Sequence, residues 1–397
     1  MGWNRVAVVG VGMIKFGELF EKSYEALLQE AYLAAIRSVD KGFDPGEIQA
    51  GWLGTCLGSA MGLEIPGGAS LAATVGLVEI PVTRVENGCP TGSDTFRNAC
   101  LGVASGVYDV AIAIGVEKMR DKPTEESLLS IAAQGHPILS RGGIAPSLFA
   151  PQATRHMHEF GTTKEQMALV AVKNHHNGCL DPYAHFQTEI TVEQVLSSPP
   201  VSYPLQLLDC CPQTDGAAAA ILCRADLARR YTDRPVYVAG FGMGSDYLYL
   251  TEKERATEFA ATRRAAKQAY AMAGVSPRDI DVAEVHDCFT ITEILNYEDL
   301  GFCEKGEGGR FIQEGKSQLS QLGGSLPVNP SGGLLAKGHP LAATGLAQIA
   351  ELYWHLREES SVSNRQAHLR RGYALQHNVG GFGIATSVVT ILTNHAD

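Results

Sequence analysis

Cys89 has the residue type and the setting of a covalent catalyst. It lies in Val85-Glu86-Asn87-Gly88-Cys89-Pro90-Thr91-Gly92-Ser93, where a strand-like approach meets a stretch typical of a buried helix. A thiol at such a junction lies against the unpaired N–H groups and positive end of the helix, which favour the nucleophilic thiolate. The plainer alternative is a small buried hydrophobic side chain, the common role of a free cysteine near a helix start. A catalytic role for Cys89 therefore requires a base.

His339 is the candidate base. It stands in Lys337-Gly338-His339-Pro340-Leu341-Ala342-Ala343-Thr344-Gly345, a Gly-rich turn that leads into a helix-forming stretch. Cys89 and His339 each precede a proline, a residue that the first turn of a helix tolerates. We therefore expect the two side chains to occupy corresponding places in a duplicated fold.

A third reactive cluster is Glu284-Val285-His286-Asp287-Cys288-Phe289-Thr290, which follows a strand-like run. Histidine, aspartate and cysteine are metal-ligand types, but consecutive side chains on a strand point to opposite faces, so one ion could not easily collect all three. We expect His286 and Cys288, two residues apart, to share a face and project together into a site at the strand end. No CxxC or HExxH spacing occurs in the sequence, and we expect no metal site.

The fourth cluster is Gln376-His377-Asn378-Val379-Gly380-Gly381-Phe382-Gly383. Its glycines permit close approach of the backbone to a ligand. The free N–H groups at Gly380 and Gly381 are candidates for stabilising an oxyanion.

The elements that must position these clusters occur twice along the chain. Val6 to Met13 recurs as Val236 to Met243, and we expect each to be an opening strand that ends in a glycine turn. Further matches follow in the same order: Ala31-Tyr32 with Ala269-Tyr270, Pro45 to Ile48 with Pro277 to Ile280, Cys56 with Cys288, and Val110 to Gly115 with Tyr373 to Gly380. This common order predicts an α/β fold of two homologous βαβ-type halves, with the reactive groups where the halves join.

We divide the chain into three parts on this basis. Residues 1–120 form the first half with Cys89, and residues 231–397 form the second half with His286, Cys288 and His339. Residues 121–230 interrupt the repeat, and we expect an inserted loop or lid domain there, together with the end of the first half.

Composition excludes several classes of protein. The chain of 397 residues is 45% hydrophobic and 19% charged, and it contains no apolar run near the roughly 20 residues that a membrane span needs. A net charge of −11 without a long basic run argues against nucleic acid. Nine cysteines without regular spacing indicate free thiols, and with no signal-peptide pattern we expect a cytoplasmic protein. Gly10 and Gly12 lack the third glycine of a dinucleotide loop, so a nicotinamide cofactor is not expected.

The four clusters together resemble the thiolase superfamily, and within it the sterol-carrier-protein-x and archaeal type. The resemblance covers nearly the whole chain, and its most specific stretch is Asn329-Pro-Ser-Gly-Gly333 leading into Gly338-His-Pro340. Common thiolases have Asn-Glu-Ala-Phe where this chain has His286 to Phe289, and a C-terminal Cys-x-Gly where it has His377 to Gly380. Both departures match the same subtype, and the family implies two βαβαβ halves in layers.

The resemblance implies a reaction and a role for each cluster. Thiolases cleave or form a C–C bond of a 3-oxoacyl-CoA with coenzyme A as a substrate, and without a tightly bound cofactor. His339 would take the proton of Cys89, whose thiolate would hold the acyl group. Cys288 would move the proton of the α-carbon. His339 with His286 would form one oxyanion hole, and the backbone N–H groups of Cys89 and Gly381 the other.

The resemblance also implies neighbours for these groups and partners for the chain. Asn378 and His377 fall where common thiolases keep their second cysteine, so they would orient the site or only pack it. The family implies a homodimer and, in this subtype, a small partner with an OB-fold and a zinc ribbon.

Two alternatives remain at this point. A related C-acyltransferase or retro-aldolase would use the same scaffold on a bulky aromatic or steroid acyl-CoA. A non-catalytic subunit would only bind acyl-CoA or lipid. The presence of Cys89, His286, Cys288 and His339 argues against pure binding, which has no use for two thiols and two imidazoles.

Overall fold

The computed structural model describes residues 4–58, 67–132, 143–360, 363–381 and 384–396. Its strands are β1 Val6–Met13, β2 Ala50–Gly54, β3 Val82–Val85, β4 Val110–Glu117, β5 Pro200–Ser202, β6 Leu205–Gln206, β7 Gly216–Arg224, β8 Val236–Ser245, β9 Val282–Glu284, β10 Tyr373–Gly380 and β11 Thr386–Thr393. Its α-helices are α1 Tyr24–Arg37, α2 Gly68–Val75, α3 Thr91–Ala104, α4 Thr124–Ala132, α5 Ala145–Phe160, α6 Lys164–Cys179, α7 Val192–Ser197, α8 Ala260–Ala273, α9 Thr290–Asp299, α10 Gly308–Gln313, α11 Gly333–Lys337 and α12 Leu341–Leu356.

Strand order shows the duplication directly. Nine strands form a mixed sheet in the order β3-β2-β4-β7-β1-β8-β11-β10-β9, and β1 meets β8 through only two residue pairs. Read outward from that junction, the first half runs β1-β7-β4-β2-β3 and the second runs β8-β11-β10-β9, followed by an isolated parallel bridge from Ala283 to Val328. The two halves therefore repeat one topology, and the predicted α/β fold of duplicated halves is confirmed.

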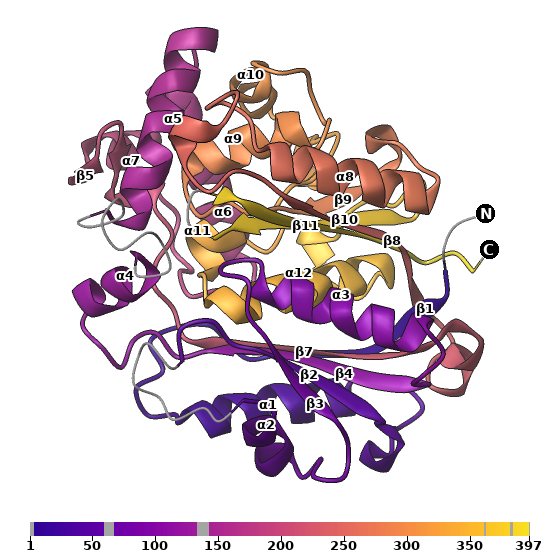
Figure 1. The fold of residues 1–397 in the computed structure, drawn as a ribbon. Helices are drawn as coiled ribbons and strands as arrows, with labels where there is room; N and C mark the ends of the chain where they lie inside the picture. Colours follow the sequence, from indigo (N-terminus) through magenta and orange to yellow (C-terminus); the bar gives the residue numbers. More distant parts are fainter. Residues whose placement is uncertain (1–3, 59–66, 133–142, 361–362, 382–383, 397) are drawn as a thin grey trace.

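The halves are stacked with helices between and outside them (Figure 1). Helices α3 and α12 lie side by side between the two halves of the sheet, α1 and α2 cover the outer face of the first half, and α8 covers the outer face of the second. The central strands β1, β4 and β7 are buried almost throughout, because helices cover both faces of the sheet.

The repeated glycines in β1 and β8 lie within the strands, so the predicted glycine turns are wrong. Their purpose is helix packing: a Cβ on Gly12 would collide with the backbone of α1, and a Cβ on Gly242 with that of α8. The same pattern therefore lets each half seat its outer helix directly on its opening strand.

The two middle helices also approach through glycines. A Cβ on Gly92 of α3 would collide with the carbonyl oxygen of Ala342, and a Cβ on Gly345 of α12 would collide with the amide of Ser93. The contact lies in the first turn or two of each helix, immediately after Cys89 and His339. Close packing of α3 and α12 thus fixes the distance between these two segments.

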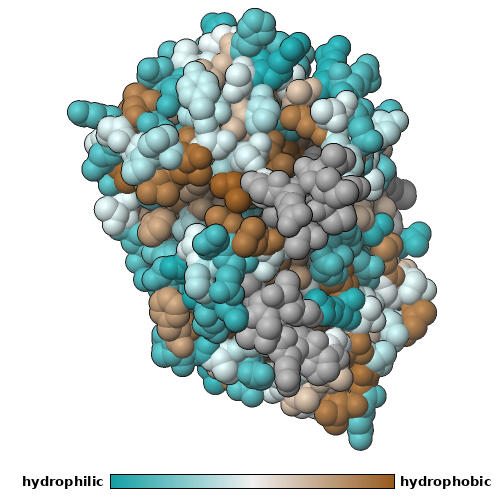
Figure 2. Space-filling model, turned by 60° about the vertical axis from the view of Figure 1, so that its left-hand side comes forward, coloured by the Kyte–Doolittle hydropathy of each residue, from teal (hydrophilic) through white to brown (hydrophobic). Residues whose placement is uncertain are grey.

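Residues between β4 and β7 form α4 to α7 and the β5–β6 hairpin, which lie at one end of the stack (Figure 1). Helix α6 packs against α9 and α11 of the second half. The face turned forward in Figure 2 carries apolar residues gathered near its centre among hydrophilic ones. Leu129, Val201 and Leu207, from this part of the chain, are exposed. Among the described residues, no helix combines the length and apolar character that a membrane crossing requires.

Candidate active site

Cys89 lies in the short turn between β3 and α3. Gly88 takes a left-handed φ of 64°, which turns the chain before the helix, and Pro90 is the residue at which α3 begins. Thr91 secures the turn, since its hydroxyl donates to the Gly88 carbonyl and accepts from the Asn87 amide. The structure therefore places the thiol at a strand-to-helix junction, as expected.

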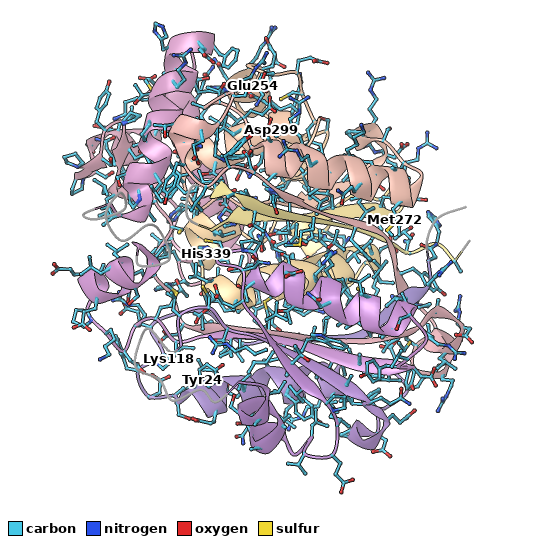
Figure 3. The ribbon with its side chains drawn as sticks, in the orientation of Figure 1. Tyr24, Lys118, Glu254, Met272, Asp299 and His339 are labelled. Atoms are coloured by element: carbon cyan, nitrogen blue, oxygen red, sulfur yellow. The ribbon has the colours of Figure 1, made fainter. Side chains whose placement is uncertain are left out.

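His339 occupies the matching place between α11 and α12. Gly338 has a φ of 102°, and α12 begins after Pro340. Nδ1 of His339 lies 2.8 Å from the hydroxyl oxygen of Thr344, whose own proton is donated to the Pro340 carbonyl. Figure 3 shows His339 at one end of the middle layer, which lies between the two halves of the sheet.

The segment after β9 delivers His286 and Cys288. Asp287, between them, accepts from the amides of Leu334 and Leu335 at the start of α11, so it ties this segment to the one that carries His339. Sγ of Cys288 lies 3.8 Å from the hydroxyl of Thr292.

Three reactive side chains converge. Sγ of Cys89 and ring nitrogens of His286 and His339 all lie within 4.8 Å of one another. The two imidazole rings are 5.0 Å apart at an interplanar angle of 84°. Nε2 of each histidine has no hydrogen-bond partner among the residues that the structure describes. The cluster thus combines a nucleophile with two unoccupied imidazole nitrogens.

Burial controls the charge states of this cluster. Burial raises the pKa of Cys89 to about 11, although the backbone N–H groups of Gly381 and of Cys89 itself oppose the rise. The predicted stabilisation of the thiolate by the helix end is therefore outweighed by desolvation. Burial also lowers the pKa of His339 to about 3 and that of His286 well below its usual range. The resting site holds a neutral thiol and neutral imidazoles.

Cys288 belongs to the edge of this cluster. Burial raises its pKa well above the usual range, and charge on either Cys211 or Cys89 would raise it further. Cys211 faces it across the chain, with its amide donating to the Cys288 carbonyl at 2.9 Å. No sequence motif marks Cys211.

The end of β10 lies against the nucleophile. A Cβ on Gly380 would stand 2.5 Å from Cβ and 2.9 Å from Sγ of Cys89, so only glycine fits there. The Gly381 amide hydrogen-bonds Cys89 and lowers the pKa of its thiol. Phe382 and Gly383, the last two members of the predicted cluster, lie outside the described residues.

Asn378 and His377 point to opposite faces of β10. Asn378 faces the middle layer, where its side chain contacts Ser93, Gln348 and Nδ1 of His286. His377 faces the outer layer and bonds to the hydroxyl of Thr262 on α8 at 3.0 Å. Of these two residues, the structure brings Asn378 to the catalytic cluster and leaves His377 away from it.

Glu117 is a neighbour that no motif indicated. Its carboxylate, at the end of β4, accepts from the amides of Cys56, Leu57 and Ala342. Burial raises its pKa to about 7, and its charge raises the pKa of Cys89. In an alignment of the β4 sequence with the β10 sequence, Glu117 corresponds to Gly380.

Comparisons with known proteins agree with this arrangement. The family model for "Thiolase, N-terminal domain" matches residues 6–226, and that for "Thiolase C-terminal domain-like" matches residues 242–394. An acetyl-CoA acetyltransferase of Methanothermobacter thermautotrophicus is 45% identical over 96% of this chain and 98% of its own length. Sterol carrier protein 2 of Bos taurus is 36% identical over 95% of this chain and 70% of its own length. The solved Ltp2-ChsH2(DUF35) aldolase superposes with a TM-score of 0.85 at 27% identity, covering 99% of this chain and 98% of that one.

Proposed function

Since the chain belongs to the thiolase family and is a thiolase-type acyltransferase, we propose that it works through an acyl group held on Cys89. The resemblance to the archaeal and sterol-carrier type, predicted from four motifs, is confirmed by the relatives. The observation that carries the proposal is the convergence of the Cys89 sulfur with unoccupied nitrogens of His286 and His339.

In the first half-reaction His339 takes the proton of Cys89 as the sulfur attacks an acyl thioester. Because burial keeps the resting thiol neutral, proton transfer accompanies the attack and no standing ion pair precedes it. The attack breaks the bond between the acyl carbon and the sulfur of coenzyme A. His339 gives its proton to the departing thiolate, and the acyl group stays on Cys89. The negative charge on the thioester oxygen is held by the amides of Cys89 and Gly381.

In the second half-reaction, in the direction of condensation, an α-carbon of another acyl-CoA loses a proton and attacks the acyl carbon on Cys89. A C–C bond forms as the bond to the Cys89 sulfur breaks, and the sulfur takes up the proton; cleavage runs through the same steps in reverse. We assign the transfer of that proton to Cys288, whose raised pKa suits a group that must exchange protons with a weak carbon acid. His286 and His339 together stabilise the enolate oxygen. Asn378 packs beside His286, with its amide nitrogen 3.5 Å from Nδ1 of that ring.

The substrates are a 3-oxoacyl-CoA and coenzyme A, with no tightly bound cofactor. An acetyl-CoA acetyltransferase at 45% identity supports a short acyl group as the first substrate to try. A solved relative that includes a DUF35 component supports a small partner protein. A homodimer completes the proposed assembly.

A retro-aldolase is the second candidate, favoured by one observation: one of the similar solved structures, at 27% identity, is an aldolase. Retro-aldol cleavage does not require an acyl-holding thiol, whereas this chain places Cys89 beside two imidazoles. The two activities therefore differ in whether the protein becomes acylated.

The test is to incubate the protein with acetyl-CoA or acetoacetyl-CoA and to weigh it intact. We expect one acyl mass per chain, mapped by peptide sequencing to Cys89, and none in Cys89→Ala. Cys303→Ala, which removes a half-buried thiol remote from the cluster, is the matched control and should acylate normally. Equal acylation of Cys89→Ala would overturn the proposal, and cleavage of a 3-hydroxyacyl-CoA without acylation would favour the aldolase.

A further inference from the structure

Three side chains of the catalytic cluster carry the donor atoms of a metal site. Sγ of Cys89 and one ring nitrogen each of His286 and His339 lie within 4.8 Å of one another. A thiolate with two imidazoles is a ligand set that suits zinc, and three protein ligands leave a fourth coordination position open. The three residues come from separate segments of the chain, so no spacing motif marks them as a set in the sequence. The expectation of no metal site, drawn from spacing motifs, therefore does not cover this cluster.

Both imidazoles have a nitrogen that is placed to bind an ion. His286 is fully buried and His339 is 5% exposed, yet Nε2 of each ring has no hydrogen-bond partner in the described part of the chain. A buried polar atom without a partner is rare in folded proteins, and a bound ion is one of its ordinary explanations. Burial lowers the pKa of both histidines, so each ring is neutral near pH 7 and keeps one lone pair.

The other nitrogen of each ring permits this orientation. Nδ1 of His339 lies 2.8 Å from the hydroxyl oxygen of Thr344, which can accept the ring proton and leave the lone pair on Nε2. Nδ1 of His286 lies 3.5 Å from the side-chain nitrogen of Asn378, which donates both of its hydrogens to other acceptors at 2.8 Å. That contact fixes no proton on His286, so the ring is free to present its lone pair at Nε2.

The spacing of the cluster is close to that of a tetrahedral site. Zinc bonds of about 2.1 Å to nitrogen and 2.3 Å to sulfur put neighbouring ligand atoms roughly 3.3–3.6 Å apart. The two imidazole rings already stand 5.0 Å apart at an interplanar angle of 84°. Small rotations of the three side chains close the remaining distance. The backbone stays held, since the His286 carbonyl accepts from the side chain of Asn296 at 2.6 Å.

We propose that Cys89, His286 and His339 bind a zinc ion that inhibits the enzyme reversibly. Binding breaks the S–H bond of Cys89 and releases that proton to solvent, with no change of oxidation state. The ion then holds the sulfur that would attack an acyl thioester and the lone pair of His339 that would take the proton. The metal site follows from the cluster alone, whereas the inhibition rests on the proposed function.

Titration of the metal-free protein with Zn²⁺, and with Co²⁺ as a coloured probe, tests the site. Co²⁺ should give a thiolate charge-transfer band that is absent in Cys89→Ser. Cys89→Ser and His286→Asn should each weaken Zn²⁺ binding at the cluster by more than the roughly 10–100-fold that loss of a partner behind a ligand costs. Mg²⁺, which prefers oxygen ligands, should not displace the zinc.

Two control variants separate the cluster from other thiols and imidazoles of the chain. Cys303→Ala removes a half-buried thiol outside the group of three. His377→Asn removes a buried imidazole that faces the other side of β10 and bonds to Thr262 at 3.0 Å. Both variants should bind Zn²⁺ as tightly as the parent and show the same Co²⁺ band.

Inhibition is measured as release of coenzyme A from acetyl-CoA at free Zn²⁺ concentrations set by a chelator. We expect acylation of Cys89 to fall in proportion to the fraction of zinc-bound protein and to return fully when EDTA removes the ion. Protein that is already acylated on Cys89 should give no Co²⁺ band, because the acyl group occupies the same sulfur.

Alkylation of Cys89 by iodoacetamide in the parent protein, mapped by mass spectrometry, needs neither a variant nor turnover. Zn²⁺ should slow it in proportion to occupancy. Unchanged alkylation with excess Zn²⁺, or equal Zn²⁺ affinity in the parent and a folded Cys89→Ser protein, would overturn the metal site. Full activity of the zinc-bound protein would overturn the inhibition. A protein that binds zinc but is not acylated at Cys89 when metal-free would remove the proposed function and leave the metal site standing.

Discussion

The two helix starts of the middle layer occupy equivalent places in the two halves but have different neighbours. Helix α3 begins beside Cys89, under the end of β10, where Gly380 leaves room for the thiol. Helix α12 begins under the end of β4, where the carboxylate of Glu117 accepts from the Ala342 amide. The start of α3 is open, and the start of α12 is closed by a side chain of the other half. The fold thus provides two polar helix ends, and the residue at the facing strand end determines which one can receive a ligand.

Two cysteines sharpen the same comparison. Cys288 follows β9 and lies next to the cluster of Cys89, whereas Cys56 follows β2 at the corresponding position. Cys56 packs in an apolar group with Leu57, Met119 and Leu341, beside the closed helix start. Cys56 and Cys288 occupy corresponding positions in the two halves. Any difference between their roles must therefore come from the residues around them.

The largest expected effect comes from removing these thiols one at a time. Cys288→Ala should reduce C–C bond cleavage by roughly 10²–10⁴, the usual range for a positioned acid or base. From a simple acyl-CoA such as acetyl-CoA it should still form the Cys89 acyl-enzyme and release one coenzyme A per site. Steady-state turnover, intact mass and α-proton exchange of a bound acyl-CoA measure these steps separately.

Cys56→Ala is the control within the same molecule. We expect turnover within a few-fold of the parent, because the Cys56 thiol contacts the Glu86 carboxylate and apolar side chains and has no part in the proposed reaction. Normal α-proton exchange in Cys288→Ala would contradict the assignment. It would leave the proton to one of the imidazoles of the cluster.

A smaller effect should follow from filling the space that Gly380 leaves at the start of α3. Gly380→Ala places a methyl group 2.5 Å from Cβ of Cys89, so the nucleophile or the strand must move. A displacement of about 1 Å can cost roughly 10²-fold in rate, and we expect a loss of that order in acylation measured by stopped-flow release of coenzyme A. An unchanged acylation rate would show that the end of β10 yields easily and does not set the position of Cys89.

Most residues of the candidate site could be predicted from short sequence motifs. Cys89, His339 and the His286–Cys288 pair were predicted because each follows a strand or turn and precedes a helix, a pattern of a few neighbouring residues. The duplication was predicted because matching strings recur in one order. Glu117 carried no such signal. A single glutamate at a strand end becomes informative only when the sequence of β4 is aligned with that of β10.

Two features depended on packing that the sequence does not specify. Adjacent residues on a strand face opposite ways, so His377 and Asn378 could not both reach the cluster, but which one does depends on the helix that covers each face. The pKa of Cys89 was predicted in the wrong direction for a related reason. A helix end favours the thiolate locally, whereas the desolvation that dominates arises from the whole surrounding structure.

The smallest expected effect comes from Glu117→Gln, which removes the negative charge beside the start of α12. The charge on Glu117 raises the pKa of Cys89, and Glu117 itself ionises near pH 7. The variant should therefore be alkylated by iodoacetamide at Cys89 faster than the parent at about pH 9, by less than the tenfold that one pKa unit would give. At about pH 5.5, where the parent carboxyl is protonated, the two rates should agree.

Alkylation rates mapped by mass spectrometry across this range, with denaturant unfolding as a check on stability, provide the measurement. Glutamine keeps one of the two acceptor oxygens and puts an NH2 group against the backbone amides at the other, which should cost about 1–3 kcal/mol of unfolding free energy. A ratio of alkylation rates that does not change with pH would mean that Glu117 influences Cys89 only through structure.

The glycine contact between α3 and α12 has a consequence for descent. A duplicated gene ordinarily leaves one copy free to drift while the other keeps the old task. Here Gly92 of the first copy rests on Ala342 of the second, and Gly345 of the second rests on Ser93 of the first. A side chain gained at either glycine would shift Cys89 of one copy against His339 of the other. Under the proposed function, a change in one copy is therefore tolerated only if the other copy can accommodate it.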